Sequence, residues 1–418
     1  MKQLIGRRQL VRGSLVAGTL SALPLHRLRA SPPSVKIGVL TALTGPYSSG
    51  TGEGSVVAAK LAVDDFMKLH PQSAPPFKVE IVPGDMQDSP DISSALARRW
   101  FDTEGVDAIT DIPNSAVALA VANLARAKDK AVLISGAGTA ALTGEQCSPN
   151  TVQWTYDTYA QAKGTGKTLV QQGDDTWYFI TADYAFGHSL ESETTRFIRE
   201  AGGKVLGTSA FPFPDTADFS AFLVSAQASR AKVVGIAAAG NSVVNCVKQA
   251  AEFGIVKGGQ RLAVLLLLIG DLHGLGLDLA QGLVLTDACY WDMNDGTRAF
   301  ARRFAPQFRD QMPGFGHAGV YSVVLHYLKS VEALGADKAK ASGKAAVDQM
   351  KRMPTDDPLF GKGSIRVDGR GMHNMYVWQV KTPAESKYPW DYYKLLKTIP
   401  AEDAFRPLSE GHCSFVHA

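Results

Sequence analysis

The chain has 418 residues, with 43 basic and 40 acidic side chains and a formal net charge of only +3. This length suffices for about two domains of ordinary size and for a sizeable core. Because no long run of one charge follows the first thirty residues, the composition argues against a nucleic-acid or membrane-surface partner.

The first thirty residues differ from the rest of the chain. Basic residues precede a mildly apolar stretch at 13–25, which is too short and too rich in small polar residues for a membrane-spanning helix and is typical of an export leader. The pair Arg7-Arg8 resembles a twin-arginine signal, although Gly6 and Leu10 depart from the usual pattern; ordinary secretion is the alternative. We predict a signal peptide over residues 1–30 and a periplasmic mature protein that begins near Ser31.

From residue 35 onward, short β-rich runs alternate with helix-like segments. The pattern predicts strands at 35–40, 78–82, 108–112 and 131–135, with helices at 54–69, 92–101 and 115–127. After an irregular segment at 154–160 it predicts strands at 176–181, 205–211, 233–238 and 263–269, with helices at 187–201, 219–229 and 242–253. Strands separated by helices imply crossover connections and parallel sheets, so we expect two α/β lobes.

The last part of the chain changes in character. Helices are predicted at 297–311, 318–334 and 338–353. The runs 363–367 and 375–380 read as two strands of one hairpin around the turn Asp368-Gly369-Arg370-Gly371. Beyond Thr382 we expect irregular, surface-packed chain.

The cysteines have no metal-ligand spacing. The four cysteines are Cys147, Cys246, Cys289 and Cys413. In an oxidising compartment they could form up to two disulfides, and three complete pairings are open. For Cys246 and Cys289, which lie inside apolar patterns, simple burial is the alternative.

Signatures of catalysis are missing from the sequence. The segment 164–168 looks like the end of a phosphate-binding loop, but Gln161 stands where a glycine is required, so we read it as the first turn of an exposed helix. The glycines at 50–54 have the wrong spacing for a dinucleotide fingerprint and indicate a flexible loop before a helix N-terminus, where free N–H groups favour an anion. The histidines are scattered, so we expect no metal, no cofactor and no enzyme.

Several segments resemble one known family. The segments 35–40 and 43–47 look like the mature start of a periplasmic binding protein of the branched-chain amino acid type. Residues 134–139 with 142–143 resemble that family's ligand loop, and residues 182–187 resemble the loop that opens its second lobe. The order and spacing of these motifs match the family over almost all of residues 35–380.

The resemblance implies a type I periplasmic binding fold, with two Rossmann-like lobes, parallel-rich sheets and a hinge of three crossovers. Lobe one would comprise residues 35–152 plus 288–355, and lobe two residues 153–287 plus 356–418. The ligand would lie between the lobes at the carboxyl ends of the strands.

Three segments resemble a subgroup associated with aromatic acids: 149–151, 156–160 and 290–292. Amino-acid binders of the family hold the ligand carboxylate with hydroxyl and N–H groups and neutralise its ammonium with an acid. The resemblance places the carboxylate site at Ser115, Ala137, Gly138 and Thr139. A hydroxyl and free N–H groups at a helix start bind a carboxylate without an arginine. Simple helix capping is the alternative for Ser115 and Thr139.

The other candidate ligand residues follow from the same resemblance. Thr51 stands where many relatives have an aromatic residue, and Tyr47 would supply the ring instead or would simply cover the lobe. Tyr184 and Asn241 are expected on second-lobe loops that face the cleft. Asp271 follows a strand near the position where the family has its ammonium-binding acid. If Asp271 is instead a turn residue that faces a helix start or solvent, the pocket lacks an ammonium partner and favours acids without an amino group.

Tyr156 and Tyr321 lie near the expected crossovers and would contact the ligand or pack the hinge. His317 precedes a helix and is expected as a cap or a surface group.

The resemblance therefore implies the binding component of an ABC importer, which captures a small organic solute and delivers it to a membrane permease. We expect a monomer without a nucleic-acid partner. The alternatives are the ligand-binding subunit of a membrane sensor and, from hidden catalytic groups, an enzyme.

Overall fold

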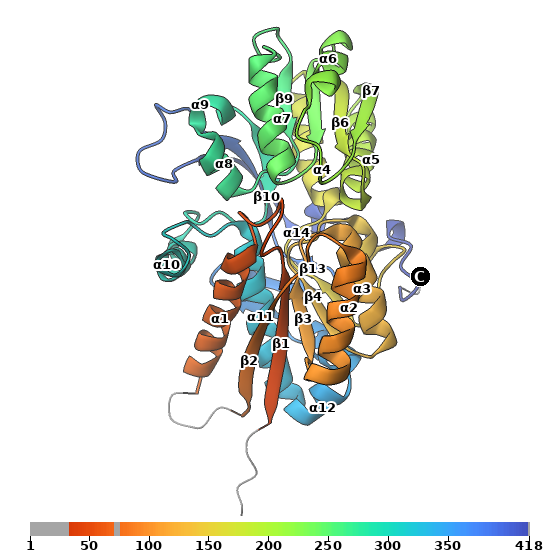
Figure 1. Ribbon diagram of the computed structural model, residues 1–418, viewed down its shortest axis with the longest axis vertical. Helices are drawn as coiled ribbons and strands as arrows, with labels where there is room; N and C mark the ends of the chain where they lie inside the picture. The colour runs from red at the N-terminus through yellow and green to blue at the C-terminus, as the bar shows by residue number, and fades with distance from the viewer. Residues whose placement is uncertain (1–32, 71–75, 417–418) are drawn as a thin grey trace, which may run out of the picture. The chain divides into compact units, whose positions relative to one another are not determined.

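The computed structural model describes residues 33–70 and 76–416, and residues 33–418 form one compact unit (Figure 1). The predicted signal peptide at 1–30 lies outside the described residues. Within them, no helix is long and apolar enough to cross a membrane.

The first sheet is entirely parallel, with the strand order β2-β1-β3-β4-β5. Its strands are β1 (Ser34–Thr41), β2 (Lys78–Asp85), β3 (Ala108–Asp111), β4 (Ala131–Ile134) and β5 (Thr151–Gln153). The connections are α1 (Gly52–Lys68), α2 (Pro90–Arg99) with the π-turn η1 (Trp100–Glu104), α3 (Ser115–Ala127) and the 3-10 turn η2 (Ala140–Thr143). The predicted strands and helices of this region are therefore confirmed.

The second sheet is also parallel, in the order β7-β6-β8-β9. Its strands are β6 (Thr176–Ala182), β7 (Lys204–Phe211), β8 (Val233–Ala237) and β9 (Arg261–Val264). The helices around it are α4 (Thr158–Gln171), α5 (Ala185–Glu200), α6 (Ser220–Ala228), α7 (Asn241–Glu252), α8 (Ile269–Leu275) and α9 (Leu277–Ala280). The alternation of strands and helices along the sequence predicted a parallel sheet here, and the structure has one.

One strand prediction in this region is wrong in its second half. The apolar run at 263–269 leaves the sheet after Val264, and α8 begins at Ile269. Leu266 and Leu268 line a cavity instead. A cavity wall excludes water as a second sheet face does, so the apolar run alone could not distinguish the two environments.

Later helices return to the first sheet. They are α10 (Asp295–Phe304) with the 3-10 turn η3 (Ala305–Gln307), α11 (Phe315–Leu334), α12 (Ala336–Ala341) and α13 (Gly343–Arg352). Figure 1 shows α11 beside α1, although more than two hundred residues separate them, and the two helices pack together. Nearly all of α11 is buried, which makes it the central helix of this part of the core.

The predicted hairpin of 363–367 and 375–380 is wrong. The turn joins β12 (Gly361–Ile365) to β13 (Gly371–Met372), which with β11 (Thr355–Asp357) form a small antiparallel sheet. The later run is β14 (Met375–Val380), and it lies between β10 (Val284–Asp287) and β15 (Tyr393–Ile399) in a separate antiparallel sheet. Local turn chemistry predicted the turn correctly, but it could not identify the partner of β14.

The tail is more regular than predicted. β15 pairs with β14 along its length, and α14 (Ala401–Ala404) and the 3-10 turn η4 (Leu408–Glu410) follow it. Four of the seven residues of β15 are exposed, so the strand lacks the apolar alternation that sequence reading relies on.

One disulfide joins Cys147 to Cys413, with the two Cα atoms 5.6 Å apart. Cys246 and Cys289 are free and buried, as the alternative of simple burial predicted. The bridge fixes the end of the tail to the loop between η2 and β5.

The glycine at position 164 in the phosphate-loop-like segment has a packing role. It lies in the middle of α4 and is buried, so the prediction of an exposed first turn is wrong. A Cβ at this position would overlap the side chain of Thr286 in β10, and the hydroxyls of Thr165 and Thr286 are 2.9 Å apart. Glycine therefore permits the close approach of α4 to β10.

We expect Gly164→Ala to lower the free energy of unfolding by about 1–3 kcal/mol through overpacking, despite the ~1 kcal/mol better helix propensity of alanine. Gly166→Ala is the matched control, since its Cβ would lie 3.1 Å from the nearest side-chain atom. Urea denaturation measures both. Equal stabilisation by the two substitutions would contradict this account of the contact.

Candidate functional site

Loops from the carboxyl ends of both parallel sheets meet around a small cavity. Its volume is about 10 Å³, roughly the space of one water molecule. The first-sheet loops contribute residues that follow β1, β3, β4 and β5, and the second-sheet contribution is the segment after β9. The lining residues are Tyr47, Gly50, Thr51, Pro113, Gly136, Tyr156, Leu266, Leu268, Phe315 and Gly316.

Aromatic rings dominate the walls of the cavity. Tyr156 meets Phe315 edge to face with the ring centroids 5.0 Å apart, and the Tyr156 hydroxyl donates to Gly136 O at 2.7 Å. The hydroxyl of Tyr47 forms a hydrogen bond with that of Tyr184, whose ring is stacked on Phe213 at 4.3 Å. Burial raises the pKa of Tyr47 well above its usual value, so this phenol stays neutral and can donate a hydrogen bond.

The predicted carboxylate residues come together beside this cavity. Ser115 Oγ accepts a hydrogen bond from Thr139 N at 3.2 Å. Asn114 caps α3 with its side chain, so Ser115 is the first residue of the helix and not its cap. Thr139 does act as a cap, because its hydroxyl accepts from Ala141 N. The capping alternative therefore holds for Thr139 alone.

The loop of Ala137, Gly138 and Thr139 is held from behind through its carbonyl groups. Gln153 Nε2 donates to the carbonyl oxygens of Ala137 and Thr139, each at 3.1 Å, and Thr158 N donates to that of Gly138 at 2.7 Å. In the described part of the chain, the amides of Ala137 and Gly138 donate to no protein acceptor. Their N–H groups are therefore available to an anion.

Thr51 lies at the start of α1, where its hydroxyl donates to Tyr47 O at 3.0 Å. His317 supports the same turn, since its Nε2 donates to Thr51 O at 3.1 Å while its Nδ1 accepts from Gly314 N at 3.2 Å. Burial lowers the pKa of His317 to about 4, so the ring is neutral. Of the two expectations for His317, the cap is confirmed, and the surface group is wrong because the side chain is buried.

Asp271 is in the first turn of α8, where its Oδ1 accepts from Ser49 Oγ at 2.6 Å. The residue is only 4% exposed, and its Oδ2 has no protein partner among the described residues. Burial raises the pKa of Asp271 to about 7, against the opposing effect of the Ser49 hydrogen bond. The hydrogen bond links a second-sheet helix to a first-sheet loop, next to the cavity.

Two predicted residues lie elsewhere. Asn241 begins α7 with an exposed side chain, and its amide donates to Pro46 O at 3.4 Å. The hydroxyl of Tyr321 donates to Asp65 Oδ2 at 2.8 Å, beside the ion pair of Asp65 with Arg303. Tyr321 thus lies on α11 within the core of the first-sheet region and does not line the cavity.

Sequence reading missed several cavity residues. Phe315 is the first residue of α11, in a segment without a motif; Phe213, which stacks on Tyr184 beside the cavity, follows β7 in a proline-rich loop. Leu266 and Leu268 were noticed, but as part of a strand. For Phe213, the sequence offered one signal: an aromatic residue in a loop that directly follows a strand. Loops at the carboxyl ends of strands carry ligand contacts in open α/β sheets.

The comparisons with known proteins agree with this geometry. The family described as periplasmic binding protein matches residues 34–387. The chain belongs to the periplasmic binding protein family. A search of curated proteins finds no match.

Solved periplasmic binding proteins give a detailed view of the likeness. One from Burkholderia mallei is 44% identical, with 91% of this chain and 99% of that chain covered and a TM-score of 0.86. A branched chain amino acid ABC transporter periplasmic ligand-binding protein from Burkholderia xenovorans is 35% identical over the same shares, with a TM-score of 0.79.

A solute binding protein from R. palustris in complex with benzoate is 18% identical, covers 88% of this chain and 97% of its own, and has a TM-score of 0.76, so it shows the shared fold. The predicted type I fold, with two lobes on parallel-rich sheets, is confirmed.

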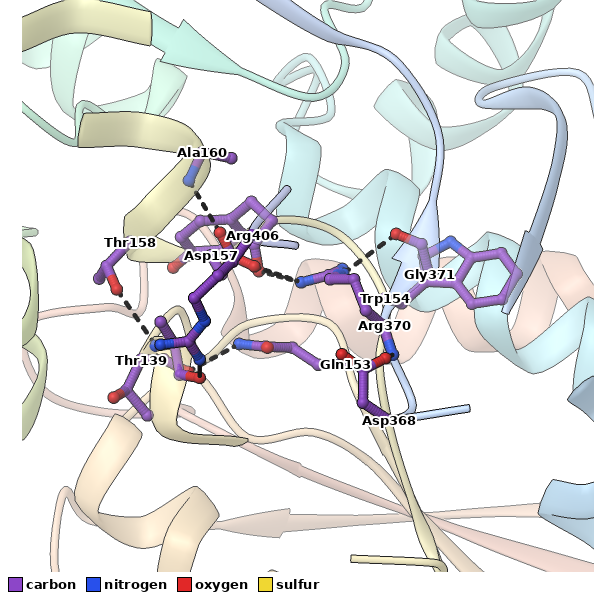
Figure 2. A network of polar contacts seen from close by, with 12 residues as sticks. Thr139, Gln153, Trp154, Asp157, Thr158, Ala160, Asp368, Arg370, Gly371 and Arg406 are labelled. Atoms are coloured by element: carbon purple, nitrogen blue, oxygen red, sulfur yellow. Dashed lines mark hydrogen bonds and ion pairs between the residues drawn. The ribbon is translucent and has the colours of Figure 1, made fainter. Parts of the chain in front are cut away.

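A buried arginine joins two distant segments of this periplasmic binding protein. Arg370 is fully buried and donates to Tyr156 O at 2.8 Å. It also lies 3.5 Å from Asp157 Oδ2, and Figure 2 shows these two residues together. Its guanidinium also stacks on the ring of Phe405 at 4.5 Å. Burial lowers the pKa of Arg370 to about 10, so it remains charged at neutral pH. The segment before α4 and the turn before β13 are therefore locked together by one cation.

Clusters of side chains able to hold a metal ion are absent from residues 33–70 and 76–416.

Proposed function

We propose that the chain is the extracytoplasmic substrate-binding component of an ABC importer, which captures a small organic solute between its two lobes. The observation that carries this proposal is the meeting of strand-end loops from both sheets on one aromatic cavity. The family membership and the 35% identical ABC transporter relative support it.

The cavity favours an organic acid with an apolar body. Hydroxyl and amide groups of Ser115, Ala137 and Gly138, beside the cavity, would bind the carboxylate, and the rings of Tyr47 and Tyr156 would contact the body of the ligand. Among the described residues that line the cavity there is no lysine or arginine. Benzoate in a relative of the same fold supports an aromatic acid, and an amino acid is the second candidate because Asp271 lies nearby.

Binding requires motion of the lobes. The closed cavity holds about one water, so a solute enters only when the lobes separate and the rings move. The first lobe, which carries the carboxylate loop, would bind the solute first, and closure would then add Tyr184 of the second lobe. Such hinge closure takes microseconds to milliseconds, and a permease would recognise the closed form.

A thermal-shift screen of the purified protein tests the proposal. The panel comprises benzoate, 4-hydroxybenzoate, short aliphatic acids, amides and branched-chain amino acids, since a tight ligand stabilises the native state by mass action. We expect shifts with aromatic or aliphatic acids. The absence of any shift would count against solute binding itself.

The pH dependence of affinity distinguishes the two ligand classes. Burial raises the pKa of the Asp271 carboxyl group to about 7 in this closed structure. Because the pKa of the exposed carboxyl group is lower, closure of the lobes over Asp271 takes up a proton. An acid without an amino group should therefore bind more weakly as the pH rises from about 5.5 to 8, and Asp271→Asn should flatten this slope. An ammonium ligand needs the ionised carboxylate, so its affinity should instead rise with pH.

Titration calorimetry at each pH measures both slopes. Asp88 and Asp111 also have a pKa raised by burial to about 6, and they remain in the Asp271→Asn variant, so only the difference between the two proteins reports on Asp271. Equal slopes in both proteins would show that Asp271 is not buried on closure.

Further features of the proposal rest on the family and, for the export route, on the Arg7-Arg8 pair alone. The partners would be the solute and an inner-membrane permease, the protein would act as a periplasmic monomer without catalysis, and the twin-arginine route would export it. We assign residues 35–152 plus 288–355 to lobe one and 153–287 plus 356–418 to lobe two.

A further inference from the structure

The carboxyl-terminal segment is attached to the first-sheet region by a disulfide and by side-chain contacts. We define residues 400–416 as the strap. Its far end is fixed by the Cys413 disulfide to Cys147, and Arg126 of α3 lies 5.1 Å above the ring of Phe415. Both anchors belong to elements of the first sheet. The strap therefore has a fixed position next to η2, directly after the loop of Ala137, Gly138 and Thr139.

Arg406 reaches from the strap to this loop. Its Nη2 donates to Ala140 O at 2.6 Å, and Arg366 Nη1 donates to Arg406 O at 2.7 Å, which fixes the backbone from which the side chain extends. Figure 2 shows Arg406 at the loop, close to Thr139, Thr158 and Gln153. The fit is close, because a Cβ at Gly144 would lie 2.5 Å from Arg406 Nη2.

The same region is connected to α5 of the second sheet, the helix that Tyr184 precedes. Arg406 Nη1 lies 3.8 Å from Glu193 Oε1, with side chains 13% and 14% exposed. Ala140 N donates to Thr158 Oγ1 at 3.1 Å, and that hydroxyl is 2.6 Å from Ser189 Oγ. Ala140 is thus held through its N–H by Thr158 and through its carbonyl by Arg406, and both holding groups contact α5.

We propose that Arg406 is a positioning residue for the ligand loop 137–140, and that the Cys147–Cys413 disulfide sets this position by fixing the strap. The inference rests on the proposed function for the meaning of the loop, but its geometry does not depend on any ligand. Reduction of the disulfide would free the end of the strap and loosen Arg406, so solute capture would depend on the oxidised state.

Hydrogen exchange of the purified protein without added ligand tests this inference. In Arg406→Gln, the hydrogen-bonded amides of residues 139–144 should exchange about 10-fold faster or more, because local opening becomes easier, while residues 233–247 of β8 and α7 should be unchanged. Arg406→Lys should restore at least part of the protection, since its ammonium can also donate to Ala140 O. The double variant Cys147→Ser with Cys413→Ser should show the same local acceleration.

Arg196→Gln is the matched control. Arg196 pairs with Glu410 of the strap at 2.6 Å and with Glu200, and within the described part of the chain it makes no hydrogen bond to Ala140. Removal of this charge should leave exchange at 139–144 unchanged. Unaltered exchange there in Arg406→Gln would overturn the proposal, and so would equal acceleration at 233–247, which would mean that Arg406 stabilises the whole fold. Failure to bind any solute would bear on the proposed function alone.

Discussion

Gly240→Ala is expected to reduce ligand affinity about 100-fold or more while leaving each lobe folded. Gly240 precedes α7 with φ of 62°, and a Cβ there would overlap the carbonyl oxygen of Pro46 in the first-sheet loop before α1. The overlap exists only when the two sets of loops meet, so the substitution raises the free energy of the closed form. A loss of about 2.7 kcal/mol in closure corresponds to that change in affinity.

Gly254→Ala separates this clash from backbone strain. Gly254 follows α7 with φ of 68°, but a Cβ there would have no atom within 4 Å. Both variants therefore place an alanine at a positive φ, although Gly240 has in addition a ψ of −143°, and only Gly240→Ala adds an overlap with the first-sheet loop. Titration calorimetry with the best ligand of the thermal-shift screen should show unchanged affinity for Gly254→Ala. Equal losses in the two variants would contradict a role for the Gly240 contact in closure.

Arg370→Met is expected to lower the free energy of unfolding by about 3–5 kcal/mol, because it leaves a buried carboxylate without its cation. Asp157 is 2% exposed, and its Oδ1 accepts from Ala160 N at 2.8 Å as the cap of α4. The Tyr156 and Gly371 carbonyl groups lose the guanidinium as well. Urea denaturation at neutral pH measures the change.

The double variant Arg370→Met with Asp157→Asn should recover part of this loss. It removes the unpaired charge, while asparagine still caps a helix well. Arg298→Gln is the control, since Arg298 pairs with Asp292 and Asp295 at the surface and its loss should have little effect. If the double variant is no more stable than Arg370→Met, the unpaired Asp157 is not the cause of the destabilisation.

The parallel sheets were predictable because local pattern determines them. The run 233–238 is apolar throughout and the run 35–40 is interrupted only by Lys36, as expected for strands covered on both faces, and helical segments separate such runs. The antiparallel strands β14 and β15 were not predictable in their pairing. β14 pairs with β10, which lies about ninety residues earlier in the chain, and nothing in a local window reports such a partner.

The candidate site was predictable only where a strand-end loop carries a motif. The loop of Ala137, Gly138 and Thr139 lies beside Ser115 as the resemblance implied, and it is joined to it by a hydrogen bond. Tyr321 lies elsewhere because α11 turns it toward Asp65, and this orientation depends on the rotation of a helix that is buried on nearly all sides. The pairing of Cys147 with Cys413 was open for the same reason, since it depends on where the tail crosses the fold.

The central claim is that the lobes close on one intact small organic acid. Isothermal titration calorimetry of the purified protein with 4-hydroxybenzoate and benzoate, followed by mass spectrometry of the recovered ligand, tests it most directly. The account predicts one site per chain, a negative heat-capacity change from burial of apolar surface, and quantitative recovery of unaltered acid. Binding of branched-chain amino acids alone would contradict the organic-acid assignment, and chemical conversion of the ligand would contradict the binding-protein role.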